Sequence, residues 1–208
     1  MSSERGIPLQ HRDPTLQAFT DAALAAFAEV VPGPAAAASL DRIAAALATP
    51  APARDRPGGR LPVCAHLDAA LAVPQPRPTL ARLVEAFRAV EPGLEWVRRA
   101  SWDETASANF VDGHANTMIL GPAGLENRRD VWLGASLLAP HVRYTDHAHA
   151  PEETYLVLSE GEFRQGDGAW FAPGVGGSFY NVPFVTHAMR SGDAPLFAFW
   201  ALRVEPEA

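Results

Sequence analysis

The sequence has almost no cysteine, and this scarcity limits the architectures open to it. Cys64 is the only cysteine among 208 residues, so the chain cannot form an internal disulfide. A single thiol also cannot build the cysteine-rich zinc sites that hold many small domains together. A chain of this kind suits a reducing compartment, and we expect a cytoplasmic location.

Long apolar runs and basic charge are also scarce. No stretch approaches the ~18 apolar residues that a membrane-spanning helix needs. Lys and Arg number 17 against 24 Asp and Glu, which gives a formal net charge of -7. A nucleic-acid-binding surface needs a concentrated positive field. The composition therefore predicts neither a membrane nor a nucleic-acid partner, and it favours an enzyme or a small-molecule binder.

The chain divides into two parts of different composition, residues 1–100 and 101–208. The first part is rich in Ala and Leu, and its apolar residues recur at helical spacing. This spacing predicts helices at 14–31, 38–48, 64–72 and 78–90. Asp13 followed by Pro14 is a typical helix start, with a capping side chain before a proline at the first helical position.

The second part contains short apolar or alternating runs that Gly, Pro, Asp and Asn interrupt. These runs predict strands at 116–121, 131–139, 154–159, 161–164, 168–172, 187–191 and 196–204. Many short strands with tight turns indicate an antiparallel sandwich or barrel. We therefore expect a mainly β protein whose N-terminal helices extend the barrel or cover one of its sides.

One segment of the second part concentrates side chains that can bind metal or move protons. The set comprises His147, His149, Glu152, Glu153, Tyr155 and, farther along, His187. Residues two apart on a strand share a face, so Glu153 should point inward with Tyr155 and Glu152 outward. Imidazoles and carboxylates together suit a borderline divalent metal such as zinc, iron, manganese or nickel. The remaining histidines are expected to have no direct role; they are His11, His66, His114 and His141.

The spacing of His147, His149 and Glu153 resembles the first sequence motif of the cupin superfamily. The second cupin motif is looser, because Val185 and Ser191 stand where cupins usually have glycine and asparagine. These departures indicate a particular branch of the superfamily.

A narrower resemblance is to the cupin-type dimethylsulfoniopropionate (DMSP) lyases, in particular the DddQ-like members. It rests on a tyrosine five residues before a histidine, a glutamate four and a tyrosine six residues after it, and a second histidine thirty-eight residues after it. In this chain these residues are Tyr144, His149, Glu153, Tyr155 and His187. The resemblance implies a cupin barrel, also called a double-stranded β-helix or jelly roll. It also implies that the last four residues hold one divalent transition metal, namely zinc, iron or manganese.

The general cupin pattern differs from this set, since it makes His147 a ligand and leaves Tyr155 out. We favour the set with Tyr155. His147 is then a candidate for relaying a proton or orienting a ligand.

The resemblance implies a carbon–sulfur lyase that cleaves DMSP to acrylate and dimethyl sulfide. The hard step is removal of a proton from C2, next to a carboxylate whose charge a metal would neutralise. The resemblance implies that Tyr144 lies beside the substrate. A tyrosine near the metal can act as the base because a nearby cation favours the phenolate, so Tyr144 and Tyr155 are both candidates, and we favour Tyr144. Tyr155 is predicted to be a ligand that swings away when substrate arrives. Tyr144 has the opposite parity to His147 on a regular strand, so a bulge or turn at 145–146 is required.

The sulfonium end of the substrate needs aromatic faces, and Trp200 is the predicted wall for it. Three alternatives remain open at this level. The chain could be another metal-dependent cupin enzyme, such as a dioxygenase or isomerase. It could be a non-catalytic small-molecule-binding cupin, or a lyase for a related β-substituted propionate. A homodimer is also expected, because cupins often form one.

Overall fold

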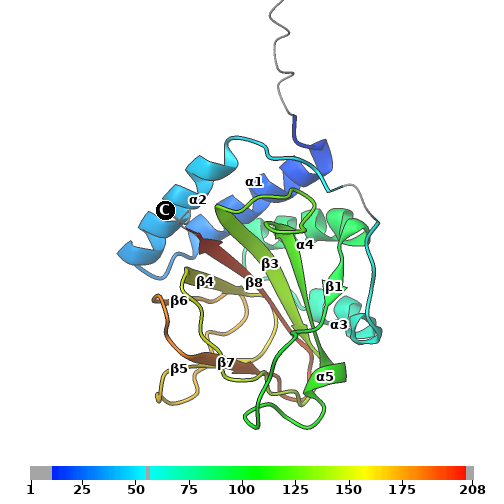
Figure 1. The fold of residues 1–208 in the computed structure, drawn as a ribbon, viewed down its shortest axis with the longest axis vertical. Coiled ribbons are helices and arrows are strands. Elements are labelled where there is room, and N and C mark those ends of the chain that lie inside the picture. The colour runs from blue at the N-terminus through cyan, green and yellow to red at the C-terminus, as the bar shows by residue number, and fades with distance from the viewer. Residues whose placement is uncertain (1–10, 55–56, 205–208) are drawn as a thin grey trace, which may run out of the picture.

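The computed structural model describes residues 11–54 and 57–204, which form an antiparallel β architecture with helices on one side (Figure 1). The helices of the first part are α1 (Pro14–Glu29), α2 (Pro34–Leu47), η1 (Pro62–His66), α3 (Leu67–Leu71), α4 (Pro78–Val90) and η2 (Glu91–Gly93). A short α5 (Phe110–Gly113) follows later in the chain. All the predicted helical segments are confirmed, and the carboxylate of Asp13 caps α1 by accepting the backbone N–H groups of Thr15 and Leu16. None of the helices in the described residues is long and apolar enough to cross a membrane.

Within the described residues, eight strands form two sheets. The strands are β1 (Trp96–Val97), β2 (His114–Leu120), β3 (Val131–Leu138), β4 (Glu152–Val157), β5 (Glu162–Gln165), β6 (Ser178–Asn181), β7 (His187–Arg190) and β8 (Leu196–Arg203). The larger sheet has the order β1-β2-β3-β8-β4-β6, and the smaller one pairs β5 with β7. Every pairing between these strands is antiparallel.

Two predictions about strands were wrong. Residues 168–172 do not form a strand, and only an isolated bridge joins Phe171 to Phe163. The backbones of Phe171 and Phe163 exchange two hydrogen bonds, but the pairing extends no further, and the partly buried ring of Phe171 packs against the core. Conversely, Ser178–Asn181 forms β6, which was not among the predicted strands.

The central strands are covered on both faces, which explains their dense apolar sequences. On β8, Phe197 and Phe199 face the helices, where they pack against Phe19 and Phe87. The alternate residues Ala198 and Trp200 face the interior between the sheets. The helices therefore share one core with the outer face of the large sheet, and its inner face is left free to build a site. The division at residue 100 stays a prediction.

Candidate metal centre

The inner face of the barrel brings together three side chains that could hold a metal ion. His149, Glu153 and His187 each offer one ligand atom, and these atoms lie within 4.8 Å of one another; the described residues contain no other such group of His, Cys, Asp and Glu. Glu153 comes from β4, His187 from β7, and His149 from the irregular segment that precedes β4. Residues far apart in the chain therefore meet because two sheets face each other.

Both histidines are held so that one nitrogen is tied to the backbone and the other points at the carboxylate. Nδ1 of His149 lies 2.8 Å from the carbonyl of Pro151, and Nδ1 of His187 lies 2.9 Å from that of Val185. Their Nε2 atoms lie 3.4 and 3.2 Å from Oε2 of Glu153. A carbonyl partner at Nδ1 fixes the tautomer that leaves Nε2 free to bind a metal.

The group fits a metal by a further observation. Nε2 of His187 is buried, and it has no hydrogen bond of acceptable geometry despite its closeness to Glu153. A buried polar atom without a partner costs about 1–3 kcal/mol, so native proteins rarely leave one. Two imidazoles and one carboxylate are also a ligand set that zinc, iron and manganese accept. The residues present therefore fit a divalent transition metal.

Glu153 is charged although it is only 3% exposed. Burial by itself would raise its pKa, but the neighbouring His149 and His187 hold the pKa well below its usual range. Asn181 on β6 adds a hydrogen bond, with Nδ2 donating to Oε2 at 3.0 Å, and Gln165 in turn donates to Oδ1 of Asn181 at 2.6 Å. The strand parity predicted for Glu153 is confirmed, since Glu152 instead bonds to Arg42 and Tyr180 away from the cavity.

An extra residue in the segment 143–147, which pairs with β7, places Tyr144 and His147 on the same side. The backbone of Arg143 pairs with that of Arg190, and the backbone of His147 pairs with that of His187. The segment from 143 to 147 therefore advances four residues while β7 advances three. The extra residue is a bulge between 143 and 147, as the parity of Tyr144 required. Both Tyr144 and His147 consequently line the cavity.

A chain of hydrogen bonds ends on the hydroxyl of Tyr144. Nδ2 of Asn116 donates to Tyr144 Oη at 2.8 Å, and Oγ of Ser136 donates to Oδ1 of Asn116 at 2.6 Å. Nε1 of Trp200 donates to Oγ of Ser136 at 3.1 Å. Burial raises the pKa of Tyr144, while the nearby guanidinium of Arg99 opposes that rise. A chain of donors that ends on this oxygen stabilises negative charge there.

The other two predicted catalytic residues also lie in this cavity. The ring of Tyr155 stacks on Phe179 at 4.9 Å and lies 6.3 Å from the ring of His187. Burial raises the pKa of Tyr155 well above its usual value, and the charge of Glu153 raises it further. His147 packs 4.1 Å from the ring of His187, and burial together with His187 lowers the pKa of His147 to about 3. His147 lies outside the three-ligand group, and Tyr155 stays a predicted fourth ligand.

The cavity that these residues line is small, about 210 Å³. Its walls are formed by Arg99, Asn116, Met118, Trp132, Ser136, Tyr144, His147, His149, Glu153, Tyr155, Met189, Trp200 and Leu202. Drug-sized ligands need pockets of about 300–1,000 Å³, so this volume favours a substrate of few atoms. Every predicted site residue except the buried His187 is in this wall.

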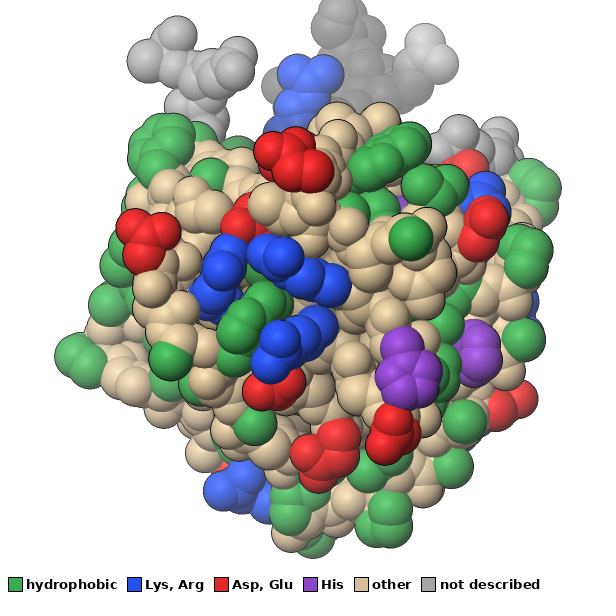
Figure 2. Space-filling model, turned by 90° about the horizontal axis from the view of Figure 1, so that it is seen from below, with side chains coloured by type: hydrophobic (Ala, Val, Ile, Leu, Met, Phe, Trp, Pro, Cys, Tyr) green, Lys and Arg blue, Asp and Glu red, His purple; other side chains and the backbone are tan. Residues whose placement is uncertain are grey.

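A cluster of arginines lies at the segment 143–147, which carries Tyr144 and His147. The guanidinium carbons of Arg143, Arg164 and Arg190 lie 4.3 to 5.6 Å from the ring of Trp170. Arg143 and Arg164 both donate to the carboxylate of Asp146. Figure 2 views this side of the molecule, where basic side chains gather around a hydrophobic one. These contacts hold the bulged segment whose inner face carries the base candidate.

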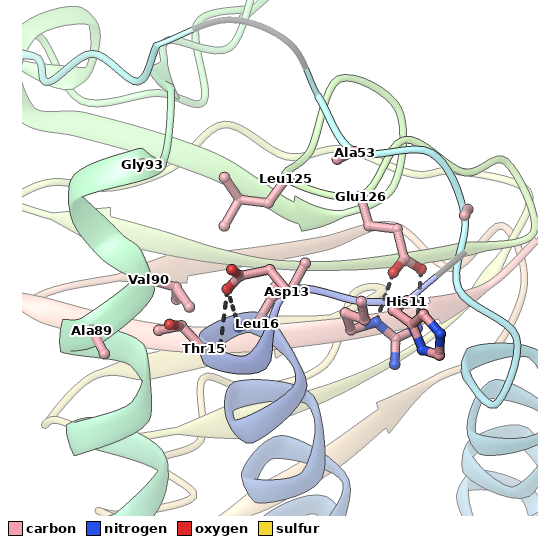
Figure 3. A pocket seen from close by; sticks show the side chains of 12 residues that line it. His11, Asp13, Thr15, Leu16, Ala53, Ala89, Val90, Gly93, Leu125 and Glu126 are labelled. Atoms are coloured by element: carbon pink, nitrogen blue, oxygen red, sulfur yellow. Dashed lines mark hydrogen bonds and ion pairs between the residues drawn. The ribbon is translucent and has the colours of Figure 1, made fainter. Parts of the chain in front are cut away.

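A larger cavity, about 510 Å³, lies between the start of α1 and the end of α4 (Figure 3). It shares no wall residue with the cavity described above. Its polar groups partner one another, since Asp13 caps α1 and Arg12 donates to Glu126. None of the predicted site residues lines it. We therefore assign the chemistry to the smaller cavity.

Comparison with known proteins identifies the family of the chain. The family model for DMSP lyase matches residues 35–198, which is most of the chain. The chain belongs to the DMSP lyase family. Membership confirms the predicted enzyme class, a carbon–sulfur lyase that acts on the small molecule DMSP.

Solved DMSP lyases share the fold along nearly the whole chain. DddQ from Ruegeria pomeroyi DSS-3 is 24% identical, with a TM-score of 0.68, and the match covers 95% of each chain. A chain from the crystal structures of the DMSP lyases RdDddP and RnDddQII is 23% identical with a TM-score of 0.68, covering 91% of this chain and 92% of that one. A cupin-2 domain from Rhodospirillum rubrum is 15% identical with a TM-score of 0.44, covering 56% of this chain and 74% of its own. No curated protein matches the chain.

The likenesses to the two solved DMSP lyases, together with the sheet topology, confirm the predicted mainly β fold with an N-terminal helical extension. The structure also adds residues of this DMSP lyase that sequence reasoning missed. They are Arg99, Asn116, Trp132, Ser136 and Asn181. Asparagine and serine are common in turns and on surfaces, so only their three-dimensional positions separate these from the rest of their kind. His114, for which no direct role was predicted, supports the backbone of Arg99, because its Nε2 accepts the Arg99 N–H at 2.8 Å.

Proposed function

We propose that this lyase cleaves DMSP to acrylate and dimethyl sulfide with one divalent transition metal: zinc, iron or manganese. The residues proposed to hold the metal are His149, Glu153, Tyr155 and His187. The observation that carries the proposal is the convergence of two free imidazole nitrogens on the Glu153 carboxylate beside a buried tyrosine. When bound, the metal would supply a Lewis acid for the substrate carboxylate.

In the proposed reaction Tyr144 removes the proton from C2. The Asn116 amide already donates to its oxygen, so a phenolate formed on the buried Tyr144 keeps a hydrogen-bond partner. The electron pair of the broken C–H bond forms the C2–C3 double bond, and the C3–S bond breaks with its pair on sulfur. Dimethyl sulfide therefore leaves neutral and needs no acid. His147 lies between the rings of Tyr144 and His187, placed to pass the proton onward.

Trp200 is proposed to bind the sulfonium end of the substrate. Its ring lies against Gly134, where an added Cβ would come within 2.3 Å of the indole, so the glycine lets the ring lie flat on β3. The bond from Nε1 to Ser136 fixes the ring in this position. An indole face attracts a cation that has methyl groups and no hydrogen-bond donor.

Two substitutions of Trp200 test whether its aromatic face binds the sulfonium. Trp200→Leu should raise KM for DMSP about 2- to 30-fold, because a cation–π contact of ~0.5–2 kcal/mol is lost. Trp200→Phe keeps an aromatic face but loses the N–H and part of the ring area, so its KM should rise less than that of the leucine variant. Steady-state kinetics on both variants measure this. Equal KM values for the wild type and the leucine variant would remove Trp200 from the sulfonium site.

A direct assay tests the proposed function. Protein stripped with a chelator and reloaded with one metal at a time should release dimethyl sulfide and acrylate in equal amounts from DMSP. The stripped protein should release neither. Metal binding without product from DMSP, under every metal tried, would favour another metal-dependent cupin enzyme or a non-catalytic binding cupin. Faster turnover of a different β-substituted propionate would reassign the substrate and keep the chemistry. A cytoplasmic location and a homodimer stay predictions from the sequence.

A further inference from the structure

One cation lines the proposed active-site cavity, and the mechanism above gives it no role. Arg99 is the only Arg or Lys among the residues that form the cavity wall. Its guanidinium carbon lies 6.0 Å from the centre of the Tyr144 ring. Arg99 is half-buried, so its charge is partly withdrawn from water and an accompanying anion would stabilise it.

Arg99 is held by two hydrogen bonds, one from its backbone and one from its side chain. Its own N–H donates to Nε2 of the buried His114 at 2.8 Å, and its side-chain Nε donates to the carbonyl of Ser101 at 3.0 Å. Nδ1 of His114 bonds to the carbonyl of Phe110, which leaves Nε2 as an acceptor. These bonds place the guanidinium before any ligand arrives.

Arg99 has no acidic partner in the part of the chain that the structure describes. Its neighbour Arg98 differs, since it donates to Asp112 at 2.8 Å on the surface. The guanidinium of Arg99 lies close enough to the Tyr144 hydroxyl to lower the pKa of that tyrosine against the effect of burial, and it faces no carboxylate among the described residues. A guanidinium in this position can bind a planar anion through two parallel hydrogen bonds.

We propose that Arg99 forms a carboxylate-binding subsite that holds the substrate with C2 against Tyr144. This inference rests on the proposed function and adds a residue to it. The carboxylate is bonded directly to C2, so the group that binds the carboxylate and the base that attacks C2 must be neighbours. Arg99 and Tyr144 are neighbours of this kind.

The subsite also orients the substrate and defines its class. The positive guanidinium repels the sulfonium, so the carboxylate should lie toward Arg99 and the sulfonium toward Trp200, which lines the same cavity. Substrates should therefore be propionates with a free carboxylate, and esters or amides should bind poorly. Arg99 forms and breaks no covalent bond, and the proton from C2 goes to Tyr144 as above.

Binding of acrylate, the product, tests this subsite apart from turnover. Calorimetry on the metal-loaded enzyme should give an acrylate Kd that Arg99→Ala weakens about 10- to 100-fold, the range of a hydrogen bond to a charged group. Adding guanidinium at millimolar concentration should restore part of the affinity in the alanine variant. Arg98→Ala is the matched control and should leave the Kd unchanged. Acrylamide, which carries no charge, should bind all of these proteins equally.

The outcomes separate this inference from the proposed function. An unchanged acrylate Kd in Arg99→Ala overturns the subsite, even where the wild type cleaves DMSP. Arg99-dependent acrylate binding in a wild type that does not cleave DMSP supports the subsite and overturns the reaction. Arg99→Lys keeps the charge and should retain more affinity than alanine, so a folding defect of the alanine variant leaves the inference testable.

Discussion

Glu153→Gln should leave the enzyme without bound metal and should lower turnover of DMSP by about 10³-fold. The size follows from the several kcal/mol that a Lewis acid supplies to such a transition state. Glutamine preserves the volume and can still accept the hydrogen bond from Asn181, but it removes the negative charge on which His149 and His187 converge. Metal content by elemental analysis and release of dimethyl sulfide measure the two effects.

Glu152→Gln is the control for this variant. Glu152 is the adjacent residue on β4, but its carboxylate bonds to Arg42 and Tyr180 outside the cavity. Loss of a partly exposed ion pair of this kind costs about 0–1 kcal/mol of stability, and metal content should not change. A Glu153→Gln enzyme that keeps its full metal content and turnover would show that the site lies elsewhere.

Tyr144→Phe should lower kcat for DMSP by about 10²- to 10⁴-fold, the usual contribution of a positioned general base. The substitution removes one oxygen and keeps the ring, which packs edge-on against Phe110 and His114. The metal content should stay at the wild-type level, because this oxygen is not among the proposed ligands. Kinetics and elemental analysis on the same preparation separate a lost base from a lost metal.

Tyr180→Phe is the matched tyrosine control. Its hydroxyl donates to Glu152 on the far side of β4, and both burial and that carboxylate raise its pKa to about 12. Its removal should leave kcat unchanged. Full turnover by Tyr144→Phe would reject the assignment of Tyr144 and leave Tyr155 as the base candidate.

Local features of the chain were predictable because short-range physics determines them. The carboxylate of Asp13 before Pro14 starts α1 as expected, since a helix leaves its first N–H groups without partners. The parity of β4 places Glu153 inward and Glu152 outward, since side chains alternate on any strand. The one-residue bulge between 143 and 147 could also be inferred, because Tyr144 and His147 cannot otherwise share a side.

Contacts between distant segments were not predictable in the same way. Arg99 lies outside the predicted barrel segment, and nothing near it in the sequence marks it as different from Arg98. Asn181 reaches Glu153 because β6 pairs with β4, a pairing that the turn-like sequence of β6 did not indicate. The aromatic content of 168–172 suggested a strand, although Phe171 makes only an isolated bridge to Phe163 and packs, partly buried, against the core.

The sequence by itself determined the chemistry available to this protein: imidazole and carboxylate side chains at cupin spacing, two tyrosines beside them and no competing thiol site. Only the tertiary structure decided which cation and which amides face that chemistry, since the folding of two sheets onto each other brings Arg99, Asn116 and Asn181 to it. The physical reason is the distance along the chain over which each interaction acts. Side-chain alternation and helix capping act over a few residues, whereas the charge and hydrogen bonding of a cavity depend on segments that meet only when the whole core is buried.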